Sequence, residues 1–203
     1  EIVEIVYSYL NQKKYRLALN KLLEVKNSNG FISGLLGFIY ESGLQDIDNA
    51  HRHYLKAVEK GNTKAINNLA VLYENEYKDF EKAERFYLLA IEKGNVRSIN
   101  NLGLLYYKKM KDYVKAQKYF ELAIEKGFPF ANINLGLLFQ NEYKNFEKAE
   151  AYYLKAIAAG AKKAYYYLGS LYQNSFHDYR KAESFYQKAV EEGDMQAMYH
   201  LGF

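Results

Sequence analysis

Basic and amide side chains recur together in this sequence at a spacing of four residues. Lys64 precedes Asn68, and Arg97 precedes Asn101. Residues four apart lie on one face of a helix, so each pair would present a cation beside an amide. An amide can both donate to and accept from a peptide backbone, while a lysine or arginine attracts a carboxylate. The pattern predicts recognition of a peptide rather than a chemical reaction.

Residue types that commonly perform catalysis or hold metals are not grouped in this way. His51 and His53 are two residues apart and would point to different sides of a helix, and no histidine pair has the spacing of a helical zinc site. Glu81 and Glu84 flank Lys82, which indicates a solvated surface rather than an acid–base pair. The chain has no cysteine, and its glycines are isolated rather than gathered in a phosphate-binding loop. We therefore expect no enzyme activity, no metal and no cofactor.

The composition favours a folded helical protein. Hydrophobic residues make up 49% of the 203 residues and aromatic residues 17%, with a single proline. The net charge of +4 is too small to indicate a nucleic-acid binder by itself. No apolar stretch approaches the roughly 18–20 residues of a membrane span. No signal peptide is visible, and the lack of cysteine favours a reducing compartment, so we expect a cytoplasmic location.

Many residue types return every 33 positions, which indicates internal repeats. One column is glycine (Gly61, Gly94, Gly127, Gly160, Gly193) and another is leucine (Leu36, Leu69, Leu102, Leu135, Leu168, Leu201). Alanine and aromatic columns keep the same interval. Segments 74–84 and 140–150 are nearly identical two periods apart, which suggests duplication of a two-repeat block. His53 stands in a column otherwise filled by rings, so we interpret it as a packing residue.

Each period is predicted to contain two helices, A and B. Helix B should begin after an N-cap residue, provided in turn by Asp46, Asp79, Asp112, Asn145 and Asp178, and should end at the glycine column, where a positive φ is needed. Pro129 is expected in the first turn of a helix A, where its missing N–H costs little. Small residues in the column of Gly37 and Ala70 should let the two helices approach closely.

The pattern A-x-x-x-L-G-x-L-Y followed by D-Y-x-K-A-x-x-Y-x-K-A-I-E-K-G resembles the Sel-1-like repeats, relatives of the tetratricopeptide repeats. Its fullest matches are 98–127 and 164–193. The resemblance implies an all-α fold, a right-handed α/α solenoid of five 33-residue helix-pair repeats in a single elongated domain, 1–203. We expect a degenerate helix pair at 1–28, repeats at 29–61, 62–94, 95–127, 128–160 and 161–193, and a partial repeat at 194–203.

The resemblance also implies a function. The A helices of such a solenoid line its concave face, where positions that vary between repeats are available to a partner. We expect a non-catalytic bacterial scaffold that binds a protein or peptide, with an acidic segment or C-terminal carboxylate, in an adaptor, host-interaction or immunity role. The predicted partner-binding residues are Lys64, Asn67, Asn68, Val71, Asn75, Arg97, Asn100, Asn101, Leu104, Lys108, Phe130, Asn134, Leu137, Asn141, Lys163, Tyr166 and Tyr167.

Alternatives stay open at this point. An asparagine directly before the core leucine, as at Asn68, Asn101 and Asn134, is also common in this family, so these amides could instead hydrogen-bond to the neighbouring helix. Some relatives are associated with β-lactam binding, but serines such as Ser98 and Ser170 lack the lysine of a Ser-x-x-Lys motif. Tyr165–Tyr167 are candidates for exposed rings that stack on single-stranded nucleic acid. Phe31, Leu35 and Phe38 would make the first end of the face apolar, and the helix at 195–203 is a candidate for end-to-end self-association.

Overall fold

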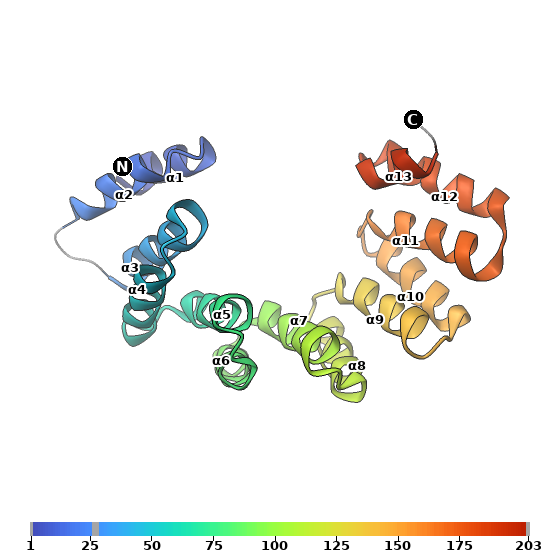
Figure 1. Ribbon diagram of the computed structural model, residues 1–203, viewed down its shortest axis with the longest axis horizontal. Coiled ribbons are helices and arrows are strands. Elements are labelled where there is room, and N and C mark those ends of the chain that lie inside the picture. Colours follow the sequence, from blue (N-terminus) through green and yellow to red (C-terminus); the bar gives the residue numbers. More distant parts are fainter. Residues whose placement is uncertain (1, 26–28, 202–203) are drawn as a thin grey trace. The chain divides into compact units, whose positions relative to one another are not determined.

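The computed structural model describes residues 2–25 and 29–201, and every regular element within these ranges is helical (Figure 1). Residues 1 and 26–28 of the predicted degenerate pair and residues 202–203 of the predicted partial repeat lie outside the described residues. The chain forms two compact units, residues 1–98 and 99–203. No described helix is long and apolar enough to cross a membrane.

The first unit is a series of helical hairpins. Its elements are α1 (Ile2–Asn11), α2 (Tyr15–Leu23), α3 (Gly30–Phe38), the π-helical turn η1 (Ile39–Leu44), α4 (Ile47–Glu59), α5 (Thr63–Leu72), the π-helical turn η2 (Tyr73–Tyr77) and α6 (Phe80–Glu92). Within hairpins, α1 packs on α2, α3 on α4 and α5 on α6, while α4 packs on α5 of the next repeat. The boundary between the two units falls within α7 (Val96–Leu105).

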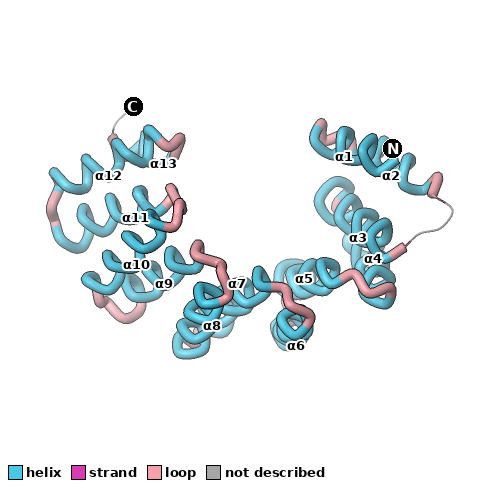
Figure 2. The backbone as a smooth tube through the Cα atoms, turned by 180° about the vertical axis from the view of Figure 1, so that it is seen from behind, coloured by secondary structure: helices cyan, strands magenta, loops and turns pink. Residues whose placement is uncertain are grey.

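The second unit continues the same plan. Its elements are the π-helical turn η3 (Tyr106–Met110), α8 (Tyr113–Glu125), α9 (Ala131–Asn141), α10 (Phe146–Ala158), α11 (Ala164–Leu171), the π-helical turn η4 (Tyr172–Phe176), α12 (Tyr179–Glu191) and α13 (Met195–His200). Hairpins α9–α10 and α11–α12 stack through α10 and α11, and short loops join the helices (Figure 2). These packed pairs confirm the predicted all-α helical-repeat fold of the solenoid class.

Side-chain caps start the B helices where the sequence predicts. Asp79 Oδ1 accepts a hydrogen bond from the Lys82 N–H at 3.0 Å, and Asp46, Asp112, Asn145 and Asp178 make the equivalent bond. The glycine column that ends each B helix has φ between +80° and +86°, which a side chain rarely adopts. These two columns fix the ends of helix B, and the prediction for both is confirmed.

A second capping column, not recognised from the sequence, starts the A helices. Asn29, Asn62, Asn95 and Asp194 each accept a backbone N–H at the start of a helix A. The column continues with Phe128 and Ala161, which have no side-chain acceptor. The helices that follow them begin two residues later than α5 does at Thr63, namely at Ala131 and Ala164 rather than 129 and 162.

The late start of α9 corrects one prediction. Pro129 was expected in the first turn of a helix A, but it lies in the turn that precedes α9. Before α9, the Ala131 N–H bonds to the Phe128 carbonyl oxygen as in the capped repeats, and the N–H groups of Asn132 and Ile133 also bond three residues back, to Pro129 at 3.0 Å and Phe130 at 3.1 Å. Without a capping side chain at position 128, the backbone satisfies its first donors through this tighter turn.

The cap at Asn62 gives a stability prediction. Its Oδ1 accepts from the N–H groups of Lys64 and Ala65, and its Nδ2 donates to the Gly30 carbonyl oxygen at 2.9 Å. We expect Asn62→Ala to lower the free energy of unfolding by about 1–2 kcal/mol, because loss of an N-cap typically costs this much. Urea denaturation followed by circular dichroism measures the change. Asn75→Ala, at an exposed position of η2, is the matched control and should change stability by less than about 0.5 kcal/mol.

Small residues in helix A make room for a ring from helix B. A Cβ added to Gly136 would lie 2.3 Å from Cε1 of Tyr153, and one added to Gly103 would lie 2.7 Å from the Phe120 ring. Gly37 and Gly169 face Tyr54 and Tyr186 in the same way. The rings opposite are almost wholly buried. Close approach of the two helices, as predicted, is therefore a requirement of each hairpin core.

The hydroxyls of these buried rings are paired within their own repeat. Tyr87 donates to Glu74 Oε2 and Tyr153 to Gln140 Oε1, both at 2.8 Å, and Tyr54 and Tyr186 donate to Glu41 and Gln173. The column has Phe at 120, and the residue in the acceptor column of that repeat is Tyr107 rather than Glu or Gln. Ring and acceptor therefore change together from one repeat to the next.

A second set of contacts joins adjacent repeats. Nε2 of His51 on α4 and the Tyr73 hydroxyl of η2 lie 2.8 Å apart. In the second unit the Tyr172 hydroxyl of η4 donates to Glu150 of α10. Burial and the hydrogen bond to this carboxylate raise the pKa of Tyr172 to about 12, so the hydroxyl stays protonated as a donor. The polar residue on helix B thus holds the next helix A in place.

His53 packs as the sequence predicts. Its ring stacks on Tyr40 with centroids 5.3 Å apart and planes 11° apart. Tyr73 stacks on Phe86 with nearly the same geometry, 5.3 Å and 8°. The pKa of His53 is lowered, mainly by burial and then by the nearby Lys56 and Arg52. A histidine ring therefore takes the place of the phenylalanine or tyrosine ring of the other repeats.

Candidate functional site

The first unit presents a polar and apolar stripe along its A helices. On α5 and η2, Lys64 and Asn75 are exposed, while Asn68 and Val71 are half-buried. On α3, Phe31 is 43% and Phe38 is 38% exposed. We call these six residues the helix A face: Phe31, Phe38, Lys64, Asn68, Val71 and Asn75. Its mixture of rings, amides and a cation suits noncovalent binding of a peptide.

Phe31 and Lys64 meet at a notch between the starts of α3 and α5. The notch has a volume of about 390 Å³ and is lined by Asn29, Gly30, Phe31, Lys60, Gly61, Asn62, Thr63 and Lys64. Asn62 forms its floor, because this side chain caps α5 and donates to the Gly30 carbonyl oxygen. Lys60 directly precedes Gly61 at the end of helix B, and nothing in the repeat pattern places it beside Phe31.

Two predicted contact residues, Asn67 and Asn100, are buried. They are 7% and 6% exposed. The Asn67 Oδ1 accepts from the Ser98 hydroxyl at 2.8 Å, and the Asn100 Oδ1 accepts from Asn134 Nδ2 at 2.7 Å. These amides join one helix A to the next. The sequence left that alternative open for the neighbouring column of asparagines, which includes Asn134, and not for Asn67 and Asn100. The binding surface is therefore drawn without Asn67 and Asn100.

Asn68 contacts the hairpin core and also belongs to the helix A face. It is half-buried, and its side chain hydrogen-bonds to the Tyr54 hydroxyl, which also donates to Glu41 at 2.6 Å. Burial, followed by the contact with Glu41, raises the pKa of Tyr54. The amide therefore supports the hairpin core from one side while its other side belongs to the helix A face.

Candidate residues of the second unit lie on α7, η3, α9 and α11 and in the turns that precede α9 and α11. Phe130 is 51% exposed, Lys108 is exposed, and Leu104, Asn101 and Leu137 are half-buried.

Asn141 is exposed, and its Nδ2 donates to the Tyr107 hydroxyl at 3.3 Å. Asn134 is half-buried by its bond to Asn100. The exposed members here are a ring, a lysine and an amide, as on the first unit.

Tyr166 and Tyr167 belong to a ring cluster. Tyr167 stacks on Tyr153 with centroids 5.7 Å apart, and Tyr166 contacts the rings of Tyr167, Tyr186 and His200. Both tyrosines are half-buried, and burial raises the pKa of Tyr167. Ring surfaces that pack on each other leave less area for stacking on a nucleic-acid base.

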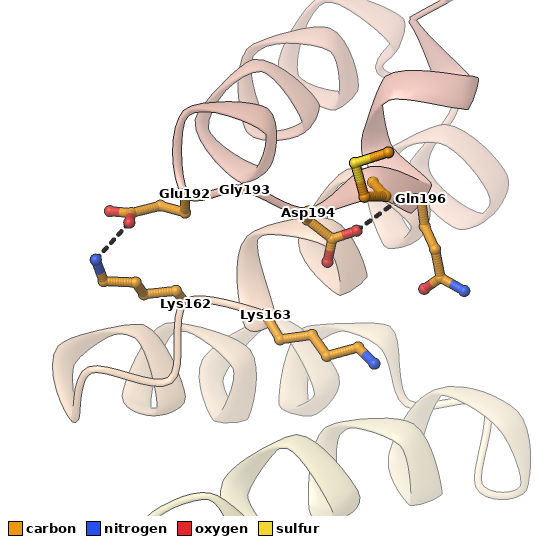
Figure 3. A pocket seen from close by; sticks show the side chains of 7 residues that line it. Lys162, Lys163, Glu192, Gly193, Asp194 and Gln196 are labelled. Atoms are coloured by element: carbon orange, nitrogen blue, oxygen red, sulfur yellow. Dashed lines mark hydrogen bonds and ion pairs between the residues drawn. The ribbon is translucent and has the colours of Figure 1, made fainter. Parts of the chain in front are cut away.

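Lys163 lines the corresponding notch between α11 and α13 (Figure 3). That notch is about 330 Å³ and contains Lys162, Lys163, Glu192, Gly193, Asp194, Met195 and Gln196. Lys162 Nζ pairs with a Glu192 carboxylate oxygen at 2.5 Å, and the Lys163 side chain extends away from this pair. Asp194 caps α13 through the Gln196 N–H at 2.9 Å.

Nothing among the described residues forms a cluster of three or more His, Asp or Glu that could hold a metal. His51, His53 and His200 each contact aromatic rings.

Family models match the repeats directly. The Sel1 repeat model matches residues 35–62, 63–95, 129–160 and 162–194, which together exceed half of the chain. The chain belongs to the Sel1 repeat family. A tetratricopeptide repeat model matches residues 96–125 of this Sel1 repeat protein. Repeats of these two kinds are generally protein–protein interaction scaffolds and generally non-catalytic.

Solved structures give the same fold. The pilF product of Pseudomonas aeruginosa is 22% identical, with a TM-score of 0.73 over 98% of this chain and 95% of that chain. A Sel1 repeat protein from Oxalobacter formigenes is 24% identical, with a TM-score of 0.71 over 98% and 88%. An immunity protein from P. aeruginosa is 30% identical, with a TM-score of 0.52 over 74% and 60%. The search of curated proteins found no match.

Proposed function

We propose that this Sel1 repeat protein binds a segment of a partner protein on the helix A face of its first unit and catalyses no reaction. The observation that carries the proposal is the exposure of Phe31, Phe38 and Lys64 beside Asn68, Val71 and Asn75. Interfaces are enriched in aromatic side chains, and amides can pair with an extended backbone.

Comparison between repeats supports this choice of surface. The columns that fill the hairpin cores hold nearly the same residue type in every repeat and are buried. The column at the start of helix A instead reads Phe31, Lys64, Arg97, Phe130 and Lys163, and all five side chains are exposed. Because these side chains do not fill a core, packing does not dictate their chemistry. The equivalent candidate surface of the second unit consists of Leu104, Lys108, Phe130, Leu137, Asn141 and Lys163.

Photo-crosslinking and a charge reversal test the surface together. p-Benzoylphenylalanine at Val71 should capture a partner that the same group at Val114, 76% exposed on α8, does not capture. Lys64→Glu, which reverses the exposed cation of the helix A face, should then weaken binding of that purified partner by tenfold or more, since a hydrogen bond to a charged group contributes about 1.5–3 kcal/mol. Calorimetry measures the affinity.

The control for charge is Lys56→Glu, at an exposed position on helix α4, and it should leave the affinity within twofold of the wild type. Equal capture at Val71 and Val114, or equal affinities of the Lys64→Glu and Lys56→Glu variants, would contradict the proposal.

A more specific role is favoured by one comparison. Two immunity proteins from P. aeruginosa are 30% and 27% identical to this chain, which spans 60% of each. We therefore propose an immunity-like interaction with a folded protein as the second candidate. In that case, the intact partner would bind at least a hundredfold more tightly than any short peptide cut from its crosslinked region. Comparable affinity for the peptide would favour the first candidate.

A further inference from the structure

A pocket on α6 and η2 combines aromatic rings with a guanidinium. Its volume is about 360 Å³, and it is lined by Tyr73, Lys82, Arg85, Phe86 and Leu89. We call it the Arg85 pocket. It shares no residue with the helix A face, and its volume is near the lower end of the roughly 300–1,000 Å³ of small-ligand sites. The pocket therefore has the size of a small molecule.

Two stacked rings and a leucine form the apolar wall of the Arg85 pocket. The Tyr73 and Phe86 rings have centroids 5.3 Å apart and planes 8° apart, and Leu89 follows Phe86 by three residues on α6. All three side chains are half-buried, so part of their apolar surface stays in contact with water. A flat apolar group gains free energy by covering such a surface.

The charge of the pocket comes mainly from Arg85. Lys82 Nζ pairs with Asp79 Oδ2 at 2.9 Å and lies 5.3 Å from the centroid of the Tyr73 ring. Arg85 is exposed, and no residue in the part of the chain that the structure describes forms a hydrogen bond or an ion pair with it, including Glu81 one turn earlier on α6. Asp79 offsets one of the two cations, so a single positive charge remains for a ligand.

Other repeats cover the equivalent ring with a lysine of their own. The column of Leu89 holds Lys155 in the fourth repeat and Lys188 in the fifth. Their Nζ atoms lie 5.0 Å and 5.6 Å from the centroids of the Tyr152 and Phe185 rings. A leucine cannot make this cation–π contact, so the second repeat leaves its ring to an apolar group.

The column of the arginine also varies between repeats. It holds Ala151 and Ser184 in the fourth and fifth repeats, and Arg52 of the first repeat donates to Asn49 Oδ1 at 3.3 Å. The third repeat has Lys118, whose ammonium lacks the planar fork of a guanidinium. Among the five repeats, the second alone combines an unpaired arginine with a leucine one turn later.

We propose that the Arg85 pocket binds a small aromatic monocarboxylate, whose carboxylate pairs with the guanidinium and whose ring covers Phe86 and Leu89. A guanidinium and a carboxylate are both planar and can form two parallel hydrogen bonds. One negative charge balances the single remaining cation, whereas a nucleoside diphosphate carries more charge than the pocket neutralises. The inference goes beyond the proposed function and does not depend on it, because the two surfaces share no residue.

Titration of the full chain with 2-naphthoate tests this site. Calorimetry measures the affinity, and the amide NMR shifts of Arg85 and Leu89 locate the ligand. We expect saturable binding with a dissociation constant of about 1 mM or lower. Neutral 2-naphthamide, which has the same shape, should bind about fivefold more weakly or worse, because it cannot neutralise the arginine.

Arginine variants give the matched pair. Arg85→Ala introduces the residue that the fourth repeat has at this position and should weaken binding about fivefold or more. Arg52→Ala removes an arginine from the same column of the first repeat and should leave the affinity within twofold of the wild type. Both arginines are exposed, so both variants should fold. Equal affinities of these two variants would overturn the inference.

A transplant tests whether the identified residues are sufficient. Ala151→Arg and Lys155→Leu together give the fourth repeat the lining of the second, beside its own Phe139, Lys148 and Tyr152. Positions 151 and 155 are both exposed, so the hairpin core is unchanged. This variant should bind a second 2-naphthoate, with new shifts at residues 151 and 155. No second site in a variant that unfolds at the same temperature as the wild type would contradict the proposal.

Two further results would overturn it. Equal affinity for 2-naphthoate and 2-naphthamide would remove the requirement for a carboxylate, and shifts confined to the helix A face would place the ligand elsewhere. Partner capture at Val71 should be unchanged in Arg85→Ala, so failure of the naphthoate experiments leaves the proposed function intact. Equal capture at Val71 and Val114 would instead refute the proposed function and leave the Arg85 pocket unaffected.

Discussion

Replacement of Tyr153 by alanine is expected to lower the free energy of unfolding by about 3–5 kcal/mol, the usual cost of removing a large buried ring. The ring is fully buried between α10 and α9, packs against Gly136 and stacks on Tyr167. Gly136 has no side chain that could fill the space, so the cavity should persist. Urea denaturation of the full chain, monitored at 222 nm, measures the loss.

Tyr153→Phe is the control for this result. It keeps the ring and removes only the hydrogen bond to Gln140, so it should cost about 0.5–1.5 kcal/mol. A loss below about 1.5 kcal/mol for Tyr153→Ala would show that the ring does not support the hairpin.

Gly136→Ala should destabilise the protein by about 1–3 kcal/mol, the typical cost of overpacking. The added Cβ would lie 2.3 Å from the Tyr153 ring, closer than van der Waals contact allows. Helix propensity alone predicts the opposite sign, a gain of about 0.5–1 kcal/mol for Gly→Ala. The direction of the measured change in urea therefore decides between the two effects.

The second repeat contains an internal control for Gly136→Ala. Its residue in the same column is Ala70, opposite Tyr87. Ala70→Gly should cost about 1–2 kcal/mol, of which about 0.5–1 comes from helix propensity and about 0.8 from the lost buried methyl group. If Gly136→Ala stabilised the chain instead, the close approach of α9 and α10 would not be a constraint.

Most of the fold could be predicted from the sequence because the core of each hairpin depends on residues within one repeat. The caps at Asp79 and its equivalents, the glycines with positive φ and the stacking of His53 all follow from local columns. The left-handed backbone conformation of the residues that follow the π-helical turns could not be predicted. Lys78 and Lys111 have φ of +54° and +58°, and lysine gives no indication of such a backbone.

The candidate site was predicted less completely, since its exposure depends on how successive repeats meet. Asn67 and Asn68 are neighbours in the sequence, yet contact with Ser98 of the next helix A buries Asn67. The period of 33 residues defines each column but not the offset between adjacent helices. Lys60 was missed for the same reason, because the notch joins the end of one repeat to the starts of two A helices.

The two kinds of tyrosine contact have different consequences for evolution by duplication. The bond between Tyr87 and Glu74 lies within a single repeat, so recombination that moves the repeat as a block carries donor and acceptor together. The contacts of Tyr73 with His51 and of Tyr172 with Glu150 cross a repeat boundary, so a transplanted repeat keeps only half of each. A hairpin can thus be exchanged without loss of its internal contacts, while the order of the hairpins is constrained because the residues that meet at a repeat boundary must be able to hydrogen-bond. Duplication of two repeats as one block keeps the contacts across the boundary between those two repeats.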